Sequence, residues 1–191
     1  MPPPLFALPL FFILLPFPGN AGQVVEETIA VAGEELVTLR DLLFWKEFYE
    51  KVRPRYPSPF FFRGKEKGKD DFQALLERTL LYQQASAISL VIPSEQEVKK
   101  RLEEVRDALG DGFLPFLAHW GMSEQDLEER LTEEVAIEKF VMLKLQQSEA
   151  TQRNGENEAE RLRFRYEALI ADLKERAGIH RLSKMSERRN P

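Results

Sequence analysis

The sequence predicts a mostly α-helical fold, with a short β-hairpin near its N-terminus and a helix and strand near its C-terminus. Apolar residues recur at three- and four-residue steps in several segments, which is the spacing of a buried helix face. Three of the expected helices begin at a serine or threonine that precedes an acidic residue by three positions, as in a capping box. The chain has 191 residues, 43% hydrophobic and 31% charged, so it can form one or two small globular units.

The first 22 residues resemble a secretory signal peptide. They carry no charge, contain an apolar run over residues 5–17, and place the small residues Gly19 and Ala21 like a signal-peptidase site. The run is too short and too interrupted by proline for a membrane span, which needs about 20 apolar residues. We expect residues 1–22 to form a signal peptide that is removed on export, so that the mature chain begins near Gly22 or Gln23. A buried terminal segment is the alternative.

A hairpin followed by a helix is predicted next. The stretch VVEETIAVAGEELVTL is rich in β-branched residues and is interrupted by Gly33, as expected for two short strands joined by a tight turn. Thr38 and Asp41 form a capping pattern, so a helix should run from about Leu39 to Lys51. It should end before RPRYPSPFFFRGKEKGK, whose prolines and glycines are typical of a loop.

The middle of the chain predicts four helices. Two of them should begin at capping pairs, one at Ser94 and Glu97 and the other at Ser123 and Asp126. A short helix should end at Gly121, because glycine readily takes the left-handed conformation found just past a helix end. The expected ranges are about 70–87, 94–109, 116–120 and 124–145.

The polar stretch SEATQRNGENEAE predicts a linker or an exposed turn before a last helix. That helix should end at Gly178 and pack against the N-terminal elements, because its apolar stripe needs burial. The stripe consists of Leu162, Tyr166, Leu169, Ile170 and Leu173. The short GIHRL segment is expected to place a strand beside the N-terminal hairpin. The predicted organisation is a signal peptide (1–22), a helical module (23–150), a linker (151–160), a C-terminal helix and strand that complete the module (161–183), and a polar tail (184–191).

The sequence has no evident catalytic or metal-binding motif. His119 and His180 lack the spacing of a ligand motif such as H-E-x-x-H. RGKEKGKDD is not a phosphate loop, because its glycines are one residue too close and Asp70 replaces the metal-binding hydroxyl. No serine or threonine has an evident base partner, so nothing indicates nucleophilic catalysis. From these three observations together, we expect no enzyme activity, metal or cofactor. Three glutamate pairs are interpreted as exposed residues on polar helix faces: Glu103–Glu104, Glu128–Glu129 and Glu133–Glu134.

The charge pattern argues against nucleic acid as a partner. The formal net charge is -5, and basic residues alternate with acidic ones, so no basic face for phosphates stands out. The chain has no cysteine, which excludes disulfides and a thiol-linked lipid anchor. We therefore expect an exported protein without a stable membrane anchor.

Several segments, in order, resemble the SurA-type periplasmic chaperones. TIAVAGEELVTLRDL is similar to the opening hairpin and helix of that family, and LLERTLLYQQASAISLVIPSEQEVKKRLEEVRDALG to the paired helices that follow. FLAHWGMSEQDLEERLTEEVAIEKFV resembles the next corner and long helix, and RYEALIADLKERAGIHRL the C-terminal return. Apart from that return, the resemblance covers about Thr28 to Val141. Ala32 departs from the family, whose turn often has asparagine.

The resemblance implies an ATP-independent holdase of the periplasm that binds unfolded polypeptides, with outer-membrane protein precursors as the expected clients. Family members commonly carry a parvulin-type prolyl isomerase domain before the C-terminal return. The polar stretch found there is too short for a domain of roughly 100 residues, so we expect no isomerase activity. A helical adaptor that binds one folded partner is the alternative, and an enzyme whose site is completed by another chain is a third possibility.

Two groups of aromatic residues are candidates for contact with clients. Three adjacent phenylalanines in a proline-flanked loop, Phe60, Phe61 and Phe62, cannot all point into one core. The second group is Trp45, Phe48 and Tyr49. Large aromatic side chains usually pack inside a protein, so packing against the module is the favoured interpretation for most of these residues.

Overall fold

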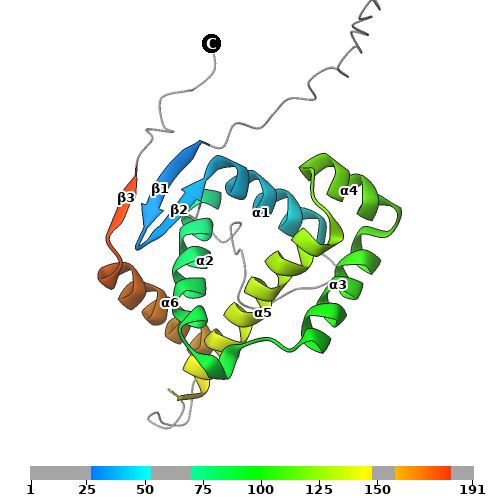
Figure 1. The fold of residues 1–191 in the computed structure, drawn as a ribbon. Helices are drawn as coiled ribbons and strands as arrows, with labels where there is room; N and C mark the ends of the chain where they lie inside the picture. Colours follow the sequence, from blue (N-terminus) through cyan, green and yellow to red (C-terminus); the bar gives the residue numbers. More distant parts are fainter. Residues whose placement is uncertain (1–26, 53–69, 148–157, 182–191) are drawn as a thin grey trace, which may run out of the picture.

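The computed structural model describes residues 27–52, 70–147 and 158–181. Most of these residues are helical, which confirms the predicted fold class (Figure 1). The elements, in chain order, are β1 (Thr28–Ala32), β2 (Glu35–Thr38), α1 (Leu39–Val52), α2 (Asp71–Ser86), η1 (Ser89–Val91), α3 (Glu95–Leu109), η2 (Gly110–Gly112), α4 (Phe113–Trp120), α5 (Glu124–Gln147), α6 (Glu158–Arg176) and β3 (Ile179–Arg181). The predicted signal peptide, the loop that contains Phe60 to Phe62, and most of the predicted linker lie outside the described residues.

A small antiparallel sheet joins the two ends of the described chain. Its strand order is β2-β1-β3, so β1 is central and pairs with both other strands. The hairpin turns at Gly33, whose φ of +62° suits glycine, and a Cβ there would lie 2.7 Å from Oε1 of Gln83. Gln83 also donates a 2.6 Å hydrogen bond from Nε2 to the carbonyl of Ala32. The predicted hairpin and the strand beside it are thus confirmed, and α2 holds the turn in place.

The predicted helix starts are present as capping contacts. Ser94 and Glu97 form a complete capping box at the start of α3. At the start of α5, the backbone nitrogen of Asp126 donates to the hydroxyl of Ser123, and its carboxylate accepts from Ser123 in return. Gly121, with φ of +59°, ends α4 in the left-handed conformation. The segment between Leu117 and Leu127 is therefore a corner between two helices, as predicted.

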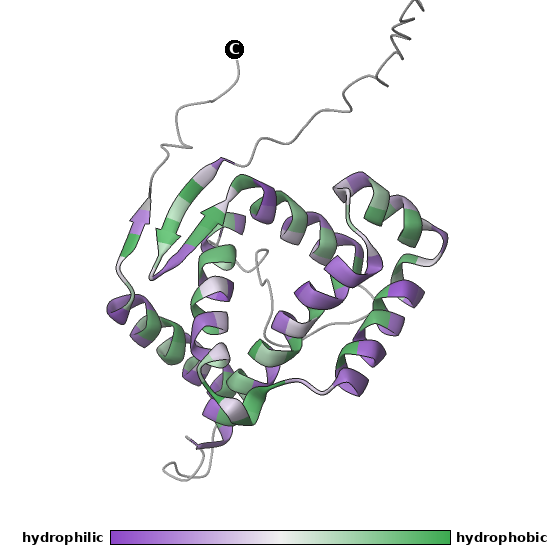
Figure 2. Ribbon diagram, in the orientation of Figure 1, coloured by the Kyte–Doolittle hydropathy of each residue, from purple (hydrophilic) through white to green (hydrophobic). Residues whose placement is uncertain are grey.

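The helices enclose one hydrophobic core. In Figure 1, the sheet and α6 lie on one side and α3 and α4 on the opposite side, with α1, α2 and α5 between them. Hydrophobic residues lie mainly along the sides of α2 and α5 that face other elements, whereas α3 is mostly hydrophilic apart from the side towards α5 (Figure 2). The largest fully buried side chains include Trp45, Phe44, Phe116, Phe140, Ile29, Leu75, Leu81, Leu127 and Leu131.

The C-terminal elements pack on the N-terminal ones, as predicted. Ile170 and Leu173 of α6 are buried in the common core, and the other residues of the stripe are partly buried against it. Lys174 Nζ lies 2.8 Å from Oε1 of the buried Glu77 on α2. Strand β3 then pairs with β1. Among the described residues, no helix is long and apolar enough to cross a membrane.

Candidate functional site

A cavity of about 520 Å³ opens beside the small sheet. All four residues of β2 line it, together with residues from the start of α1, the middle of α2, the α4–α5 corner and the first half of α5. Apolar and aromatic side chains, such as those of Leu75, Tyr82 and Met122, contribute to the wall, and charged side chains alternate with them. This volume lies within the range of about 300–1,000 Å³ that is usual for ligand pockets.

A buried charge network lies under the cavity. Arg78 on α2 lines the cavity, and its Nε lies 2.6 Å from Oε1 of Glu134 on α5. Tyr49 on α1 donates a hydrogen bond from its hydroxyl to the other carboxylate oxygen of Glu134. The guanidinium of Arg78 also stacks over the Trp45 ring, 3.8 Å from the ring centroid. A second carboxylate, from Glu133, accepts a 2.8 Å hydrogen bond from Nη2 of Arg78.

Burial and charge set the ionisation of this network. Burial raises the pKa of Glu134, although the neighbouring Arg78 and Tyr49 favour the carboxylate. Burial also raises the pKa of the Tyr49 phenol, and the Glu134 carboxylate raises it further. For Arg78, burial opposes the charge, but the Glu134 and Glu133 carboxylates outweigh it and raise the pKa. The network therefore joins α1, α2 and α5 through a neutral phenol and a charged guanidinium.

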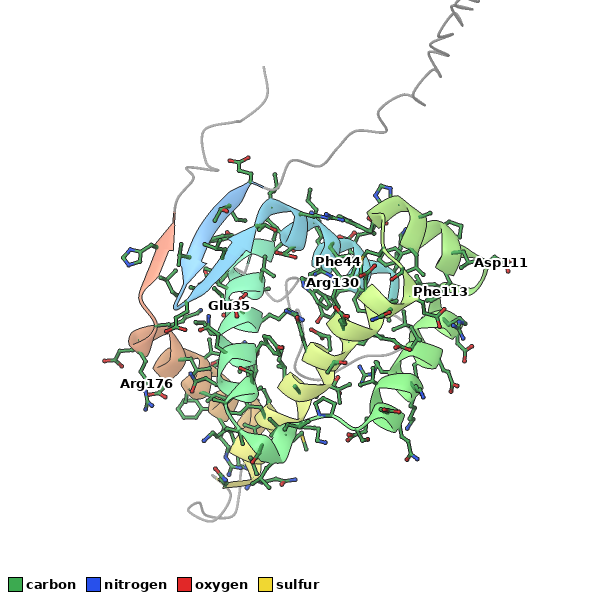
Figure 3. All side chains as sticks on the ribbon, viewed as in Figure 1. Glu35, Phe44, Asp111, Phe113, Arg130 and Arg176 are labelled. Atoms are coloured by element: carbon green, nitrogen blue, oxygen red, sulfur yellow. The ribbon has the colours of Figure 1, made fainter. Side chains whose placement is uncertain are left out.

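The wall near α1 contains a second ion pair. Both terminal nitrogens of Arg130 lie 3.1 Å from Oδ1 of Asp41. The same guanidinium lies over the Phe44 ring, 4.4 Å from the centroid, and Figure 3 shows these two residues together between α1 and α5. Arg40 donates a 2.8 Å hydrogen bond to the carbonyl of Trp120. The arginines of the wall thus already have acceptors within the protein.

The lining of the cavity is acidic overall. Five carboxylate residues line it: Glu35, Asp41, Asp126, Glu129 and Glu133. Three guanidinium residues face them: Arg40, Arg78 and Arg130. Glu35 and Glu129 are exposed, and neither forms an ion pair with another residue that the structure describes. Figure 3 shows Glu35 on the sheet side of the molecule, next to α2.

The structure buries the second aromatic candidate group, which rules it out as a client-contacting patch and confirms the favoured interpretation that these residues pack against the module. Trp45, Phe48 and Tyr49 are only 1%, 4% and 9% exposed, so they are core residues and do not form a surface patch. Their rings pack against one another, and Phe48 also lies near Phe116 of α4. Burial removes their large apolar area from water, which is why packing takes precedence over exposure. Only Trp45 reaches the cavity wall.

The interpretation of the acidic pairs as exposed residues on polar helix faces is wrong for the pair Glu133–Glu134. Glu134 is buried and bound to Arg78 and Tyr49, and Glu133 is partly buried beside Arg78. Glu134 follows Leu131 by three positions, so it lies on the buried stripe of α5 and not on its polar face. Arg78 likewise follows the buried Leu75 by three positions on α2. These two spacings are the signal that could have identified the pair.

The two histidines do not take part in this site. The His119 side chain is exposed at the end of α4, with Nε2 3.6 Å from Oε2 of Glu47, and His180 is exposed on β3. Within ranges 27–52, 70–147 and 158–181, no group of three or more His, Cys, Asp or Glu residues could hold a metal ion.

No family model matches the sequence, and a search of curated proteins found no match either.

Proposed function

We propose that this protein is an ATP-independent chaperone that binds unfolded polypeptides, in the manner of the SurA-type proteins that its sequence resembles. The observation that carries the proposal is the open cavity beside β2, whose wall mixes apolar, aromatic and charged side chains. Hydrophobic contacts are non-directional, so such a wall can accept many different sequences. Clients would be held weakly and released when folding or membrane insertion competes for them.

The distribution of exposed apolar residues favours this proposal over an adaptor for one folded partner. A dedicated interface needs a contiguous apolar patch with a polar rim. Here the large exposed hydrophobic residues of the described chain are distributed over several elements: Leu36 on β2, Leu43 on α1, Leu90 on η1 with Ile92 just after it, Leu114 on α4, Met142 on α5 and Phe164 on α6. Their spread over different elements does not favour one contiguous patch, and among them only Leu36 lines the cavity.

The proposed location is the periplasm, with outer-membrane protein precursors as clients. This part rests on the uncharged apolar segment of residues 1–22 and on the small residues Gly19 and Ala21. Mass spectrometry of the protein from fractionated cells should find a chain that begins near Gly22 or Gln23 in the periplasmic fraction. An intact Met1 in the cytoplasmic fraction would contradict the proposed location.

Aggregation suppression tests the chaperone function directly. An unfolded outer-membrane protein is diluted from urea in the presence of the full chain, and light scattering is followed; we expect scattering to fall in proportion to the chain added, without nucleotide. Leu36→Ser, at the cavity, should weaken the effect. Leu114→Ser is the matched control, since Leu114 is also an exposed leucine but lies on α4 outside the cavity. Scattering unchanged by the wild-type chain would refute the proposal.

A further inference from the structure

Among the described strands, β2 forms one edge of the sheet, and its residues line the cavity. Strand β2 is at the end of the order β2-β1-β3, and no other described strand pairs with its outer side. All of its residues, from Glu35 to Thr38, line the cavity, and Leu36 is 62% exposed. An edge strand presents unpaired N–H and C=O groups, and proteins usually cover or blunt such an edge. Here the residues of the edge strand line an open cavity of about 520 Å³.

From this arrangement and the acidic lining, we infer that the cavity binds an extended segment of a client as an added strand on β2, and that it prefers segments in which apolar and basic residues alternate. The inference rests on the proposed chaperone function and specifies how the client is recognised. Strand addition takes its affinity from main-chain hydrogen bonds, which every sequence except proline supplies. It therefore suits a protein that must bind many sequences.

The charges of the wall supply the preference for basic residues. The guanidiniums of Arg78 and Arg130 are paired with Glu133, Glu134 and Asp41, so they are not available to an acidic client. Glu35 on β2 and Glu129 on α5 are exposed carboxylates that line the cavity without an ion pair to a described residue. A lysine or arginine of the client can pair with either of them, whereas an acidic client would be repelled.

Successive side chains of a strand point to opposite sides, so an added strand meets two different environments. One set can contact the partly exposed Tyr82 and Met122 of the wall, and the other can reach the carboxylates of Glu35 and Glu129. Alternation of apolar and basic residues satisfies both. With four residues in β2, the paired stretch would be roughly 13 Å long.

Peptide binding to the full chain tests the inference. The probe is a short fluorescent peptide of alternating valine and lysine, compared with one in which glutamate replaces lysine, and binding is measured by fluorescence anisotropy. We expect the basic peptide to bind at least about tenfold more tightly, with a difference that shrinks as salt is added. Equal affinity for the two peptides would overturn the charge preference.

Backbone methylation tests strand addition separately. Two further basic peptides carry N-methyl groups on alternate residues, one on the odd and one on the even positions. Only one edge of an added strand pairs with β2, so one of these peptides should lose most of its binding and the other should keep it. If both bind as the unmodified peptide does, strand addition is refuted.

A charge-reversal variant locates the site. Glu35→Lys/Glu129→Lys should reverse the preference and favour the acidic peptide, whereas Glu103→Lys, at an exposed position on α3 outside the cavity, should leave it unchanged. An unaltered melting temperature shows that each variant is folded. If the wild-type chain suppresses aggregation but fails the peptide tests, this inference is rejected and the proposed function stands. Failure of suppression itself would reject the proposed function.

Discussion

Arg78 and Glu134 form an ion pair inside the protein, with 2.6 Å between Nε and Oε1 and with side chains that are only 7% and 4% exposed. They belong to α2 and α5, the two helices that cross the middle of the fold, and Tyr49 attaches α1 to the same carboxylate. Removing two charges from water is costly, and the cost is offset only while both partners and their hydrogen bonds are present. The pair therefore makes the packing of these helices sensitive to the loss of either partner.

Glu134→Gln should destabilise the protein by about 3 kcal/mol, because it leaves the Arg78 guanidinium buried with only the partly exposed Glu133 as a charged partner. Urea unfolding followed by circular dichroism measures the change. Glu103→Gln, on the exposed side of α3, is the control and should change stability by less than about 0.5 kcal/mol. Arg78→Met/Glu134→Leu should recover most of the loss. Equal urea midpoints for Glu134→Gln and the wild type would contradict the role given to the pair.

Tyr49→Phe should lower the free energy of unfolding by about 1.5–3 kcal/mol, since it removes a buried hydrogen bond to a charged acceptor and keeps the ring in place. The same urea experiment applies. Tyr82→Phe is the matched control: this partly buried ring lines the cavity, and its hydroxyl forms no hydrogen bond with another residue that the structure describes. A Tyr49→Phe protein as stable as Tyr82→Phe would show that the hydroxyl contributes nothing.

The elements with local signals could be predicted from the sequence. Ser94 with Glu97 and Ser123 with Asp126 form contacts within one turn, and Gly33 and Gly121 require backbone conformations that few other residues adopt. These features involve neighbours in the chain. Whether these caps and turns form therefore depends little on the rest of the fold.

The candidate site could not be predicted in the same way. Glu35 and Glu129 reach one cavity from a strand and a helix far apart in the chain, and nothing in either local segment indicates this. Trp45 could have faced a client or the core, and the neighbours that decide it belong to α2 and α5. The sequence shows Arg78 and Glu134 only as charged residues within the apolar stripes of two helices, and it does not show that they pair with each other.

The capping box of α3 should give the stability a pH dependence in acid. The backbone N–H of Ser94, then Lys139 and the Ser94 hydroxyl, lower the pKa of Glu97 from its ordinary 4.5 to about 2. A lowered pKa in the folded state stabilises the protein above the unfolded value, and this contribution is lost as the pH falls from about 4.5 to about 2.

Glu97→Gln should therefore be less stable than the wild type near neutral pH, and the difference should shrink across that acidic window. Thermal melting at a series of pH values measures it. Ser94→Ala, which keeps the backbone donor but removes the hydroxyl, should have an intermediate dependence. A constant difference between Glu97→Gln and the wild type from neutral pH to pH 2 would rule out this role for Glu97.

The C-terminal helix should be necessary for the stability of the whole fold. Ile170 is buried between α6 and the core, so Ile170→Ala should cost about 2–4 kcal/mol through lost apolar burial and the cavity that remains. Phe164→Ala is the control on the same helix, since this ring is 71% exposed and its loss should change stability by less than about 0.5 kcal/mol. Both are compared by urea unfolding.

Truncation after Gln152 tests whether α6 and β3 together are needed for the stability of the fold. It removes the buried Ile170 and Leu173, withdraws Lys174 from the buried carboxylate of Glu77, and leaves the second edge of β1 without β3. Because a domain of this size has a total stability of roughly 5–15 kcal/mol, the loss of several such contacts should lower the melting temperature sharply and expose apolar surface that binds a hydrophobic dye. A truncated chain that melts where the full chain does, and binds no more dye, would mean that α6 and β3 are an independent tail rather than part of the core.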